Sequence, residues 1–410
     1  MNSSDFKRFM ILWVGELISA IGGGLTSFGL GVYVFRETGS AGSMAIVSLL
    51  AFLPAFLLSA PAGVLADRYD RRWMMMIGDG LSALGIIYIF ACMLNGGASL
   101  IQICIGVCIS SFFSSLMDPA YKATVTDLLS DEDYAKASGL VGIAGSARYL
   151  ISPLLAGILL SFVDIKWLLL IDICTFFVTV LTTWYVKKGL TSKLSDTNES
   201  FADSFKEGFA ALKEKRGVLV LIAVSSVITM FMGAIQILSE PMILDFMSST
   251  VLGITETLCA TGMLVTSLIV GVKGIRNGYV RTLSLSLCGA GIAMLIFGSV
   301  ENIIVISVAG FWFFGMLPLA NSCLDYLVRT NIAPEKQGRA WGLIGFLSQI
   351  GYIVAYGCFG LIADMISRNM GIRIGRSAGV VIMISGILQM ILATAIYFMK
   401  DIRELETFNN

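Results

Sequence analysis

Two charged residues lie deep inside apolar stretches of the chain, where a charge is costly. Glu16 is about eight residues into the first apolar stretch, and Arg148 is about twelve residues into the fifth. At a rise of 1.5 Å per residue, these depths are about 12 and 18 Å. A carboxylate at such a depth can exchange a proton or hold a cation. The chain contains no histidine, so carboxylates are its only acids able to titrate near neutral pH.

The composition is that of a protein crossing a membrane many times. Of the 410 residues, 56% are hydrophobic and 14% are charged, and the mean hydropathy is +0.84. Soluble domains average about 25% charged residues. The formal net charge of zero argues against nucleic acid as a partner. The eight cysteines fall within or beside apolar stretches without the spacing of metal ligands, so we expect no metal site and no cofactor.

Apolar stretches of 17–25 residues are long enough to cross a bilayer as helices. We predict an all-α polytopic membrane protein with twelve transmembrane helices, near residues 9–35, 43–66, 73–94, 99–120, 137–162, 166–186, 217–244, 250–272, 280–299, 302–327, 340–366 and 375–399. The short polar start of the chain lacks a cleavage site, so the first stretch is expected to be a retained helix.

The basic residues predict which side of the membrane each connection faces. Lys and Arg concentrate in cytoplasmic connections. Of the 28 Lys and Arg residues, Arg148 lies at membrane depth, and only a few fall in the connections of the opposite side: Arg36, Lys166, Arg368, Arg373 and Arg376. We therefore expect both termini to be cytoplasmic.

The longest polar segment divides the chain into two halves of six helices. We expect an N-terminal half at 1–188, a cytoplasmic linker at 189–216 and a C-terminal half at 217–410. Four apolar residues recur in the linker at helical spacing: Phe201, Phe205, Phe209 and Leu212. This pattern favours an amphipathic helix on the inner membrane surface. The alternative is a soluble linker helix without membrane contact.

The two halves share short sequence similarities. Residues 137–142 (ASGLVG) are matched by 340–345 (AWGLIG), and Gly157 and Gly360 follow at the same offset. Parallel six-helix repeats are typical of transporters that expose a midplane site alternately to each side. The pattern therefore favours a pseudo-symmetric transporter.

A polar hinge between the second and third apolar stretches identifies a family. Its sequence GVLADRYDRR, at 63–72, resembles the G-x-L-A-D-R-x-G-R-R signature of the major facilitator superfamily. The matching residues are Gly63, Leu65, Ala66, Asp67, Arg68, Arg71 and Arg72, and Asp70 departs from the usual small residue. A weaker copy, Gly271-Val272, precedes several basic residues but has no aspartate.

A second stretch narrows the resemblance. Residues 332–345, which include Gly338 and Arg339, and residues 118–121 (DPAY) are similar to the macrolide-efflux and enterobactin-export branch. The resemblance covers essentially the whole chain and implies the twelve-helix fold of that superfamily.

The resemblance also implies a cytoplasmic gate at the hinge, with Gly63, Arg68, Gly338 and Arg339 among its residues. Asp67 would lie near the N-terminus of a helix in the other half, where a carboxylate is favoured by about 0.3–1 kcal/mol. Arg71 or Arg72 would pair with an acid at the end of the fourth helix, either Asp118 or Asp127. Such contacts would hold the cytoplasmic side shut. The alternative is that these arginines only fix the topology.

Helices one and five approach the central cavity in this family, so Glu16 and Arg148 are expected to pair directly or through water. Glu16 is then either a coupling residue or half of a structural pair. Gln236 on helix seven and Asp325 near the end of helix ten are further cavity candidates, although Asp325 could instead pair with Arg329.

Two further acids are expected to have structural roles. Asp79 on helix three and Asp172 on helix six lie on peripheral helices of this fold. We expect them to bond neighbouring hydroxyl groups, such as those of Ser82 and Thr175.

The sequence favours a secondary active transporter over an enzyme or a nucleotide-driven pump. It has no G-x-x-x-x-G-K-[ST] phosphate loop and no recognisable nucleophile–base pair. We expect proton-coupled efflux of a bulky, macrolide-like amphiphile by a monomer in a bacterial plasma membrane. The alternatives are a siderophore exporter, a lysophospholipid flippase, and a scaffold or sensor that transports nothing.

Overall fold

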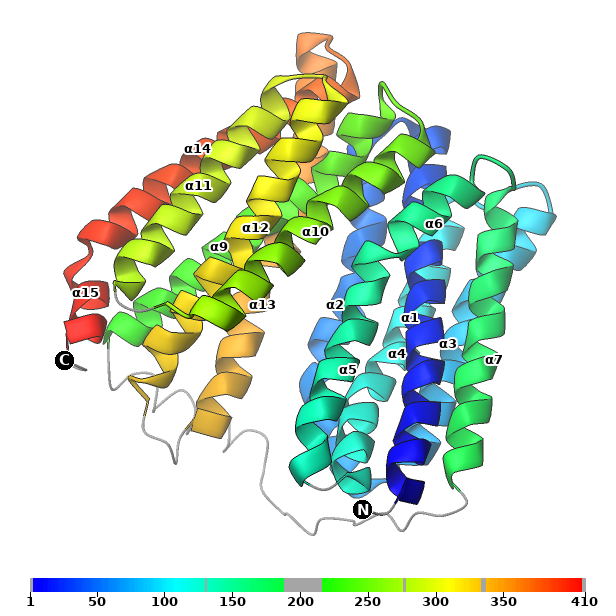
Figure 1. Ribbon diagram of the computed structural model, residues 1–410. Helices are drawn as coiled ribbons and strands as arrows, with labels where there is room; N and C mark the ends of the chain where they lie inside the picture. The colour runs from blue at the N-terminus through cyan, green and yellow to red at the C-terminus, as the bar shows by residue number, and fades with distance from the viewer. Residues whose placement is uncertain (1–2, 130, 188–215, 276–277, 333–336, 408–410) are drawn as a thin grey trace. The chain divides into compact units, whose positions relative to one another are not determined.

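The structure is a computed structural model that describes residues 3–129, 131–187, 216–275, 278–332 and 337–407 (Figure 1). Its described residues form helices and connections without strands. Twelve helices are long and apolar enough to cross a membrane, as predicted. The residues 188–215 are not described, so the expected linker helix lies outside the described residues.

The first compact unit contains residues 1–37 and 46–198. Its helices are α1 (Ser3–Thr38), α2 (Ala41–Arg68), α3 (Arg71–Leu94), α4 (Leu100–Leu128), α5 (Asp131–Leu150), α6 (Ser152–Leu159) and α7 (Ile165–Lys187). Within this unit α3 packs against α4 and α7.

Glycines allow α1 to approach α7 closely. Gly15, Gly22 and Gly29 recur every two helical turns, and each faces a side chain of α7. A Cβ atom on Gly29, for example, would lie 3.1 Å from the Leu168 side chain. Small residues at such spacing let membrane helices pack backbone to backbone.

The fifth predicted span is interrupted by a break between α5 and α6. Pro153 has no N–H group and cannot donate to the carbonyl of Tyr149, so the helix is broken one turn after Arg148. Hydrogen bonds continue on both sides of Ile151, and residues 136–159 still form one membrane span.

The second unit contains residues 38–45 and 199–410, and thus includes the first residues of α2. Its other helices are α9 (Arg216–Leu244), α10 (Ser249–Lys273), α11 (Tyr279–Ser299), α12 (Ile303–Arg329), α13 (Gln337–Met370), α14 (Ile374–Phe398) and α15 (Lys400–Thr407). Here α9 packs against α13 and α14, and α11 packs against α12 and α14.

The polar hinge is helical over nearly its whole length. The sequence predicted apolar helices ending at 66 and starting again at 73, whereas α2 continues to Arg68 and α3 begins at Arg71. Only Tyr69 and Asp70 lie between the two helices. Polar residues can continue a helix once it leaves the apolar region, so hydropathy alone misplaced both ends.

Candidate functional site

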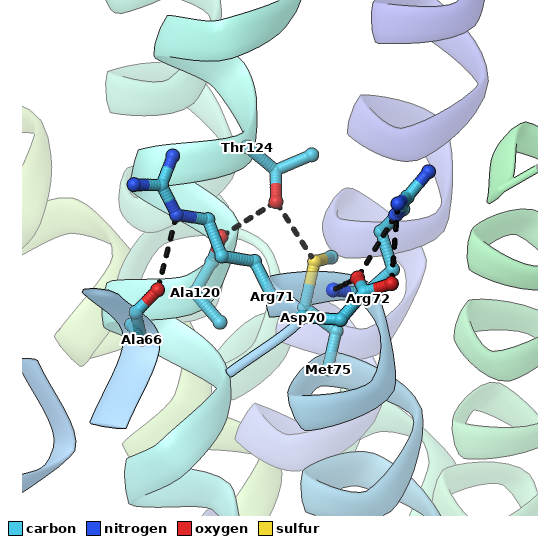
Figure 2. A network of polar contacts seen from close by, with 7 residues as sticks. All are labelled: Ala66, Asp70, Arg71, Arg72, Met75, Ala120 and Thr124. Atoms are coloured by element: carbon cyan, nitrogen blue, oxygen red, sulfur yellow. Dashed lines mark hydrogen bonds and ion pairs between the residues drawn. The ribbon is translucent and has the colours of Figure 1, made fainter. Parts of the chain in front are cut away.

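Asp70, the residue that departs from the family signature, caps the N-terminus of α3 (Figure 2). Its carboxylate accepts hydrogen bonds from the backbone N–H of Arg72 at 3.0 Å and from the Arg72 Nε at 2.9 Å. Aspartate is among the best N-cap residues because its oxygen satisfies an N–H group that has no partner in the helix. Because Arg72 is only 8% exposed, Asp70 also neutralises a buried charge.

Arg71 ties the end of α2 to α4. Its Nε donates to the Ala66 carbonyl at 3.1 Å, and its Nη1 donates to the Ala123 carbonyl at 3.2 Å. The first of these contacts is drawn in Figure 2. A guanidinium group at the C-terminus of a helix interacts favourably with the helix dipole and with carbonyl groups that lack partners.

The expected pairing of these arginines with Asp118 is not what the structure shows. Asp118 instead accepts from Lys122, one turn later on α4, at 2.7 Å, and both side chains are exposed. A Cβ atom on Gly63 would meet nothing within 4 Å, so this conformation does not require glycine there. The remaining predicted gate side chains lie outside the described residues: Asp67, Arg68, Asp127, Gly338 and Arg339.

Glu16 and Arg148 lie on adjoining helices of the first unit but form no direct ion pair in the described structure. Trp13 donates to the Leu140 carbonyl at 2.6 Å, and Ser152 donates to the Ile21 carbonyl at 3.1 Å. Along their helices, Glu16 and Arg148 lie between these two contacts. Glu16 is half-buried, Arg148 is exposed, and no ion pair within 4 Å joins them.

Glu16 lies in a mixed electrostatic environment. Asp79, Asp118, Arg148 and Lys122 are all close enough to act on its charge. Arg148 therefore attracts the Glu16 charge, while the two aspartates oppose it. Because Glu16 has no direct ion-pair partner in the described part of the chain, these more distant charges are the ones that act on its carboxylate.

Among the described acids of the first unit, Asp79 and Asp172 are the most buried, at 2% and 1% exposed. Thr175 Oγ1 lies 3.4 Å from Asp172 Oδ1, as predicted. Ser82 differs from the prediction, because it donates to the backbone carbonyl of Asp79 rather than to the carboxylate.

In the second unit, a cavity of about 200 Å³ lies between one end of each of α9, α12 and α13. Its polar lining comes from Ser225, Asn321, Asp325 and Ser348. Its apolar lining comes from Leu221, Ile222, Leu324, Val328 and Ile344. A few polar groups in a largely apolar wall are typical of small-molecule sites.

Asp325 supplies the only acidic side chain of this lining. No ion pair within 4 Å joins it to Arg329 or to another described basic residue. The alternative of a local Asp325–Arg329 pair is therefore not observed. The exposed Asp325 carboxylate is available to the polar group of a ligand.

A row of polar contacts joins α9 to α13, beginning at the cavity. Ser225 donates to the Ser348 hydroxyl at 3.2 Å, and Thr229 donates to the Ser348 carbonyl at 2.5 Å. Two turns further, Tyr356 donates to the Gln236 side-chain oxygen at 2.9 Å. The structure thus places the predicted Gln236 and Asp325 in one unit, on helices that share the cavity.

Sequence reasoning missed several residues of this region. Nothing local distinguishes Ser225, Asn321 and Ser348 from other polar residues of apolar helices. The spacing of Ser225, Thr229 and Gln236 along one face of α9 was the available signal.

Asp364 of α13 is a further residue that the sequence did not reveal. Its carboxylate accepts from Ser40 Oγ at 2.5 Å, from the Ala41 N–H at 2.9 Å and from the Gly42 N–H at 3.1 Å. Asp364 therefore caps the N-terminus of α2 inside the second unit. Gly360, one turn earlier, lies against the Ala41 carbonyl and allows the close approach.

These arrangements suit ion exchange and ligand binding at carboxylates. In the described part of the chain, no group of three or more potential metal ligands gathers. The Asp325 carboxylate lies beside a cavity with polar and apolar lining, and the Glu16 carboxylate lies within a membrane-spanning helix of the first unit.

Relatives of this chain include named efflux proteins. Macrolide efflux protein A of Streptococcus pyogenes is 25% identical over 375 residues, which cover 88% of this chain and 91% of that protein. The enterobactin exporter EntS of Salmonella typhi is 24% identical over 339 residues, which cover 82% of this chain and 80% of that protein.

Solved structures show the same fold. The nucleoside transporter NupG superposes with a TM-score of 0.76 at 14% identity, covering 97% of this chain and 98% of NupG. A bacterial homologue of the lysosomal transporter Spinster, in an inward-facing conformation, superposes with a TM-score of 0.75 at 13% identity, covering 100% of this chain and 99% of that one.

The sequence profile of the Major Facilitator Superfamily matches residues 12–356. With twelve membrane-spanning helices and relatives over most of its length, the chain belongs to the Major Facilitator Superfamily and is a transporter of that fold.

Proposed function

We propose that this transporter is a secondary active exporter that uses inward proton flow to expel a bulky amphiphilic compound by alternating access. The observation that carries the proposal is a membrane-depth carboxylate, Glu16, in a chain that matches a macrolide efflux protein along 88% of its length. Both termini would face the cytoplasm of a bacterial cell, and the monomer would be the working unit.

Glu16 is the residue we assign to proton coupling. Its side chain is half-buried, has no direct ion-pair partner among the described residues, and lies near both Arg148 and Asp79. A proton on Glu16 would free Arg148 from its attraction, and movement of Arg148 towards Glu16 would favour release of that proton. The reciprocal effect is what an antiporter requires.

The cavity beside Asp325 supports an amphiphilic cargo. Its volume of about 200 Å³ is below the roughly 300–1,000 Å³ of sites that enclose a drug-sized ligand. It would therefore hold one polar-headed part of a larger molecule. The apolar lining would contact a hydrocarbon or ring portion, and Asn321 and Asp325 would contact polar groups.

The test uses inside-out membrane vesicles from a host that lacks its own efflux systems. When respiration has acidified the vesicle interior, a macrolide added outside should be taken up and should release protons. Glu16→Gln should abolish the proton release, because the amide cannot titrate. Glu37→Gln, an exposed carboxylate change on the same helix, should leave it intact.

Other outcomes would identify the alternatives. Normal proton release in Glu16→Gln would remove Glu16 from coupling. A catecholate siderophore transported in place of the macrolide would favour the second candidate, which the similarity to EntS supports. Lysophospholipid flipping without a proton gradient would indicate a flippase, and no flux under any gradient would indicate a scaffold or sensor.

A further inference from the structure

The short helix α15 at the end of the described chain packs against one end of the second unit. Ile402 is fully buried and Leu405 is 4% exposed, and both belong to the apolar core shared with α9, α11 and α12. The polar groups of α15 contact the ends of these same three helices. None of these contacts was expected from the sequence.

The first contact is a cap on α11 provided from outside the local sequence. The Glu406 carboxylate accepts from the Tyr279 N–H at 2.8 Å and from the Val280 N–H at 3.3 Å. The residue at the N-cap position is Gly278, which has no side chain to cap with and a φ of +76°. Glu406 therefore satisfies two N–H groups that the helix leaves without partners and adds a negative charge at the positive end of its dipole.

The second contact holds the end of α12. Asn331, which is 7% exposed, donates from Nδ2 to the Leu405 carbonyl at 2.9 Å and to the Leu327 carbonyl at 2.8 Å. In addition, the ring of Tyr279, whose N–H is bound by Glu406, stacks on Tyr326 of α12 at 3.6 Å between centroids and 6° between planes.

The third contact is at the start of α9. Arg216 and Asp401 form an ion pair at 3.5 Å, and Gly217 lies directly against the Asp401 carbonyl. A Cβ atom at position 217 would collide with this backbone. The close approach of α9 and α15 therefore depends on glycine at this position.

These contacts lie next to the cavity of the second unit. Leu221, one turn after Gly217, lines the cavity from α9, and Asp325 and Val328 line it from the last turns of α12. The ends of α9 and α12 that line the cavity are therefore the ends that contact α15. The third wall of the cavity comes from α13.

We propose that Glu406 is a positioning residue: from α15 it supplies the carboxylate that is missing at the start of α11, and through Tyr279 and Tyr326 it fixes the end of α12 that carries Asp325. We call this support of the α12 end by Glu406, Tyr279 and Tyr326 the brace. The brace does not depend on whether this transporter is an exporter. Its effect on transport rests on the proposed function.

Hydrogen–deuterium exchange on the full-length protein in lipid nanodiscs tests the brace without a transport substrate. Glu406→Gln keeps the size of the side chain and removes its charge. We expect exchange about tenfold faster at the first turn of α11 and about threefold faster at Thr330 and Asn331, which directly follow α12. Glu404→Gln, on the same helix with a side chain 51% exposed and paired with Lys400, should leave both regions unchanged.

Faster exchange confined to the first turn of α11 would overturn the proposal, because Glu406 would then be a local cap. Unchanged exchange in both regions would overturn it too. Glu406→Asp provides a second variant, and its exchange should lie between those of the wild type and Glu406→Gln. Exchange in Glu406→Asp that is as fast as in Glu406→Gln would contradict the role of the charge.

A transport measurement separates the brace from the proposed function. In the vesicle assay, Glu406→Gln should raise the KM for the macrolide about threefold or more and leave the proton release per transported molecule unchanged. An unchanged KM together with faster exchange at α12 would overturn the link to the cavity. Loss of transport in the wild type would count against the proposed function and would leave the exchange result standing.

Discussion

Each unit has a hinge, between α2 and α3 in the first unit and between α10 and α11 in the second, and the helix that follows each hinge is capped by an acid from a different part of the chain. In the first unit, Asp70 caps α3 from the hinge itself and neutralises Arg72. In the second unit, Gly278 occupies the equivalent place before α11, and Glu406 reaches it from the end of the chain. The start of a helix needs a hydrogen-bond acceptor, and the fold can provide it locally or from a distant segment.

This difference affects how each hinge can move. The cap of α3 travels with α3, because Asp70 precedes it directly. The cap of α11 depends on α15 remaining docked, since 127 residues separate Glu406 from Tyr279. The second hinge is therefore the one whose stability can be changed from outside the hinge.

Asp70→Ala should have the largest effect on stability. The change removes the N-cap of α3 and leaves the buried Arg72 without this ion-pair partner. We expect a loss of about 2–4 kcal/mol, because breaking a buried pair costs more than losing a cap alone. Thermal unfolding of the purified protein in detergent, followed by tryptophan fluorescence, would measure the loss.

The double variant Asp70→Ala/Arg72→Met serves as the control. Removing both charges should be less damaging than the sum of the single changes, because the charge that Asp70 neutralises is then absent as well. If the two changes were simply additive, the local neutralisation attributed to Asp70 would be incorrect.

The elements that the sequence predicted well are those set by long, uninterrupted patterns. All twelve spans follow from apolar runs, because a helix that must cross a bilayer leaves an unmistakable length of hydrophobic sequence. The break at Ile151 was not predicted, although Pro153 was the available signal. The hinge ends were misplaced because hydropathy reports where a helix leaves the membrane and not where it stops.

Side-chain partners were predicted less well, for a physical reason. Asp118 pairs with Lys122 of its own helix, a contact visible in the i,i+4 spacing, while the family resemblance favoured the arginines. Asp364 caps a helix that begins 323 residues before it, and Glu406 caps a helix that begins 127 residues before it. No local pattern marks such contacts, so only the packing of the folded chain reveals them.

Glycine substitutions distinguish the two hinges next. Gly278→Ala should destabilise the protein by about 1–2 kcal/mol, because a φ of +76° is unfavourable for a residue with a Cβ atom. Gly63→Ala should be neutral or stabilising by up to about 1 kcal/mol, since Gly63 lies within α2 and its Cβ would enter open space. Unfolding midpoints of the two variants would test the contrast, and equal destabilisation would refute it.

The smallest expected effect concerns the stacked rings that connect the second hinge to α12. Tyr326→Leu keeps an apolar side chain but removes the stacking on Tyr279 at 3.6 Å, which should cost about 0.5–1 kcal/mol. A double-mutant cycle with Tyr279→Leu, measured by thermal unfolding, isolates this energy from burial. Among the described residues, the first hinge has no counterpart of this ring pair. A Tyr279–Tyr326 coupling energy near zero would therefore mean that the two hinges differ only in where the capping acid comes from. A measurable coupling would mean that the second hinge transmits its distant cap to the helix that carries Asp325.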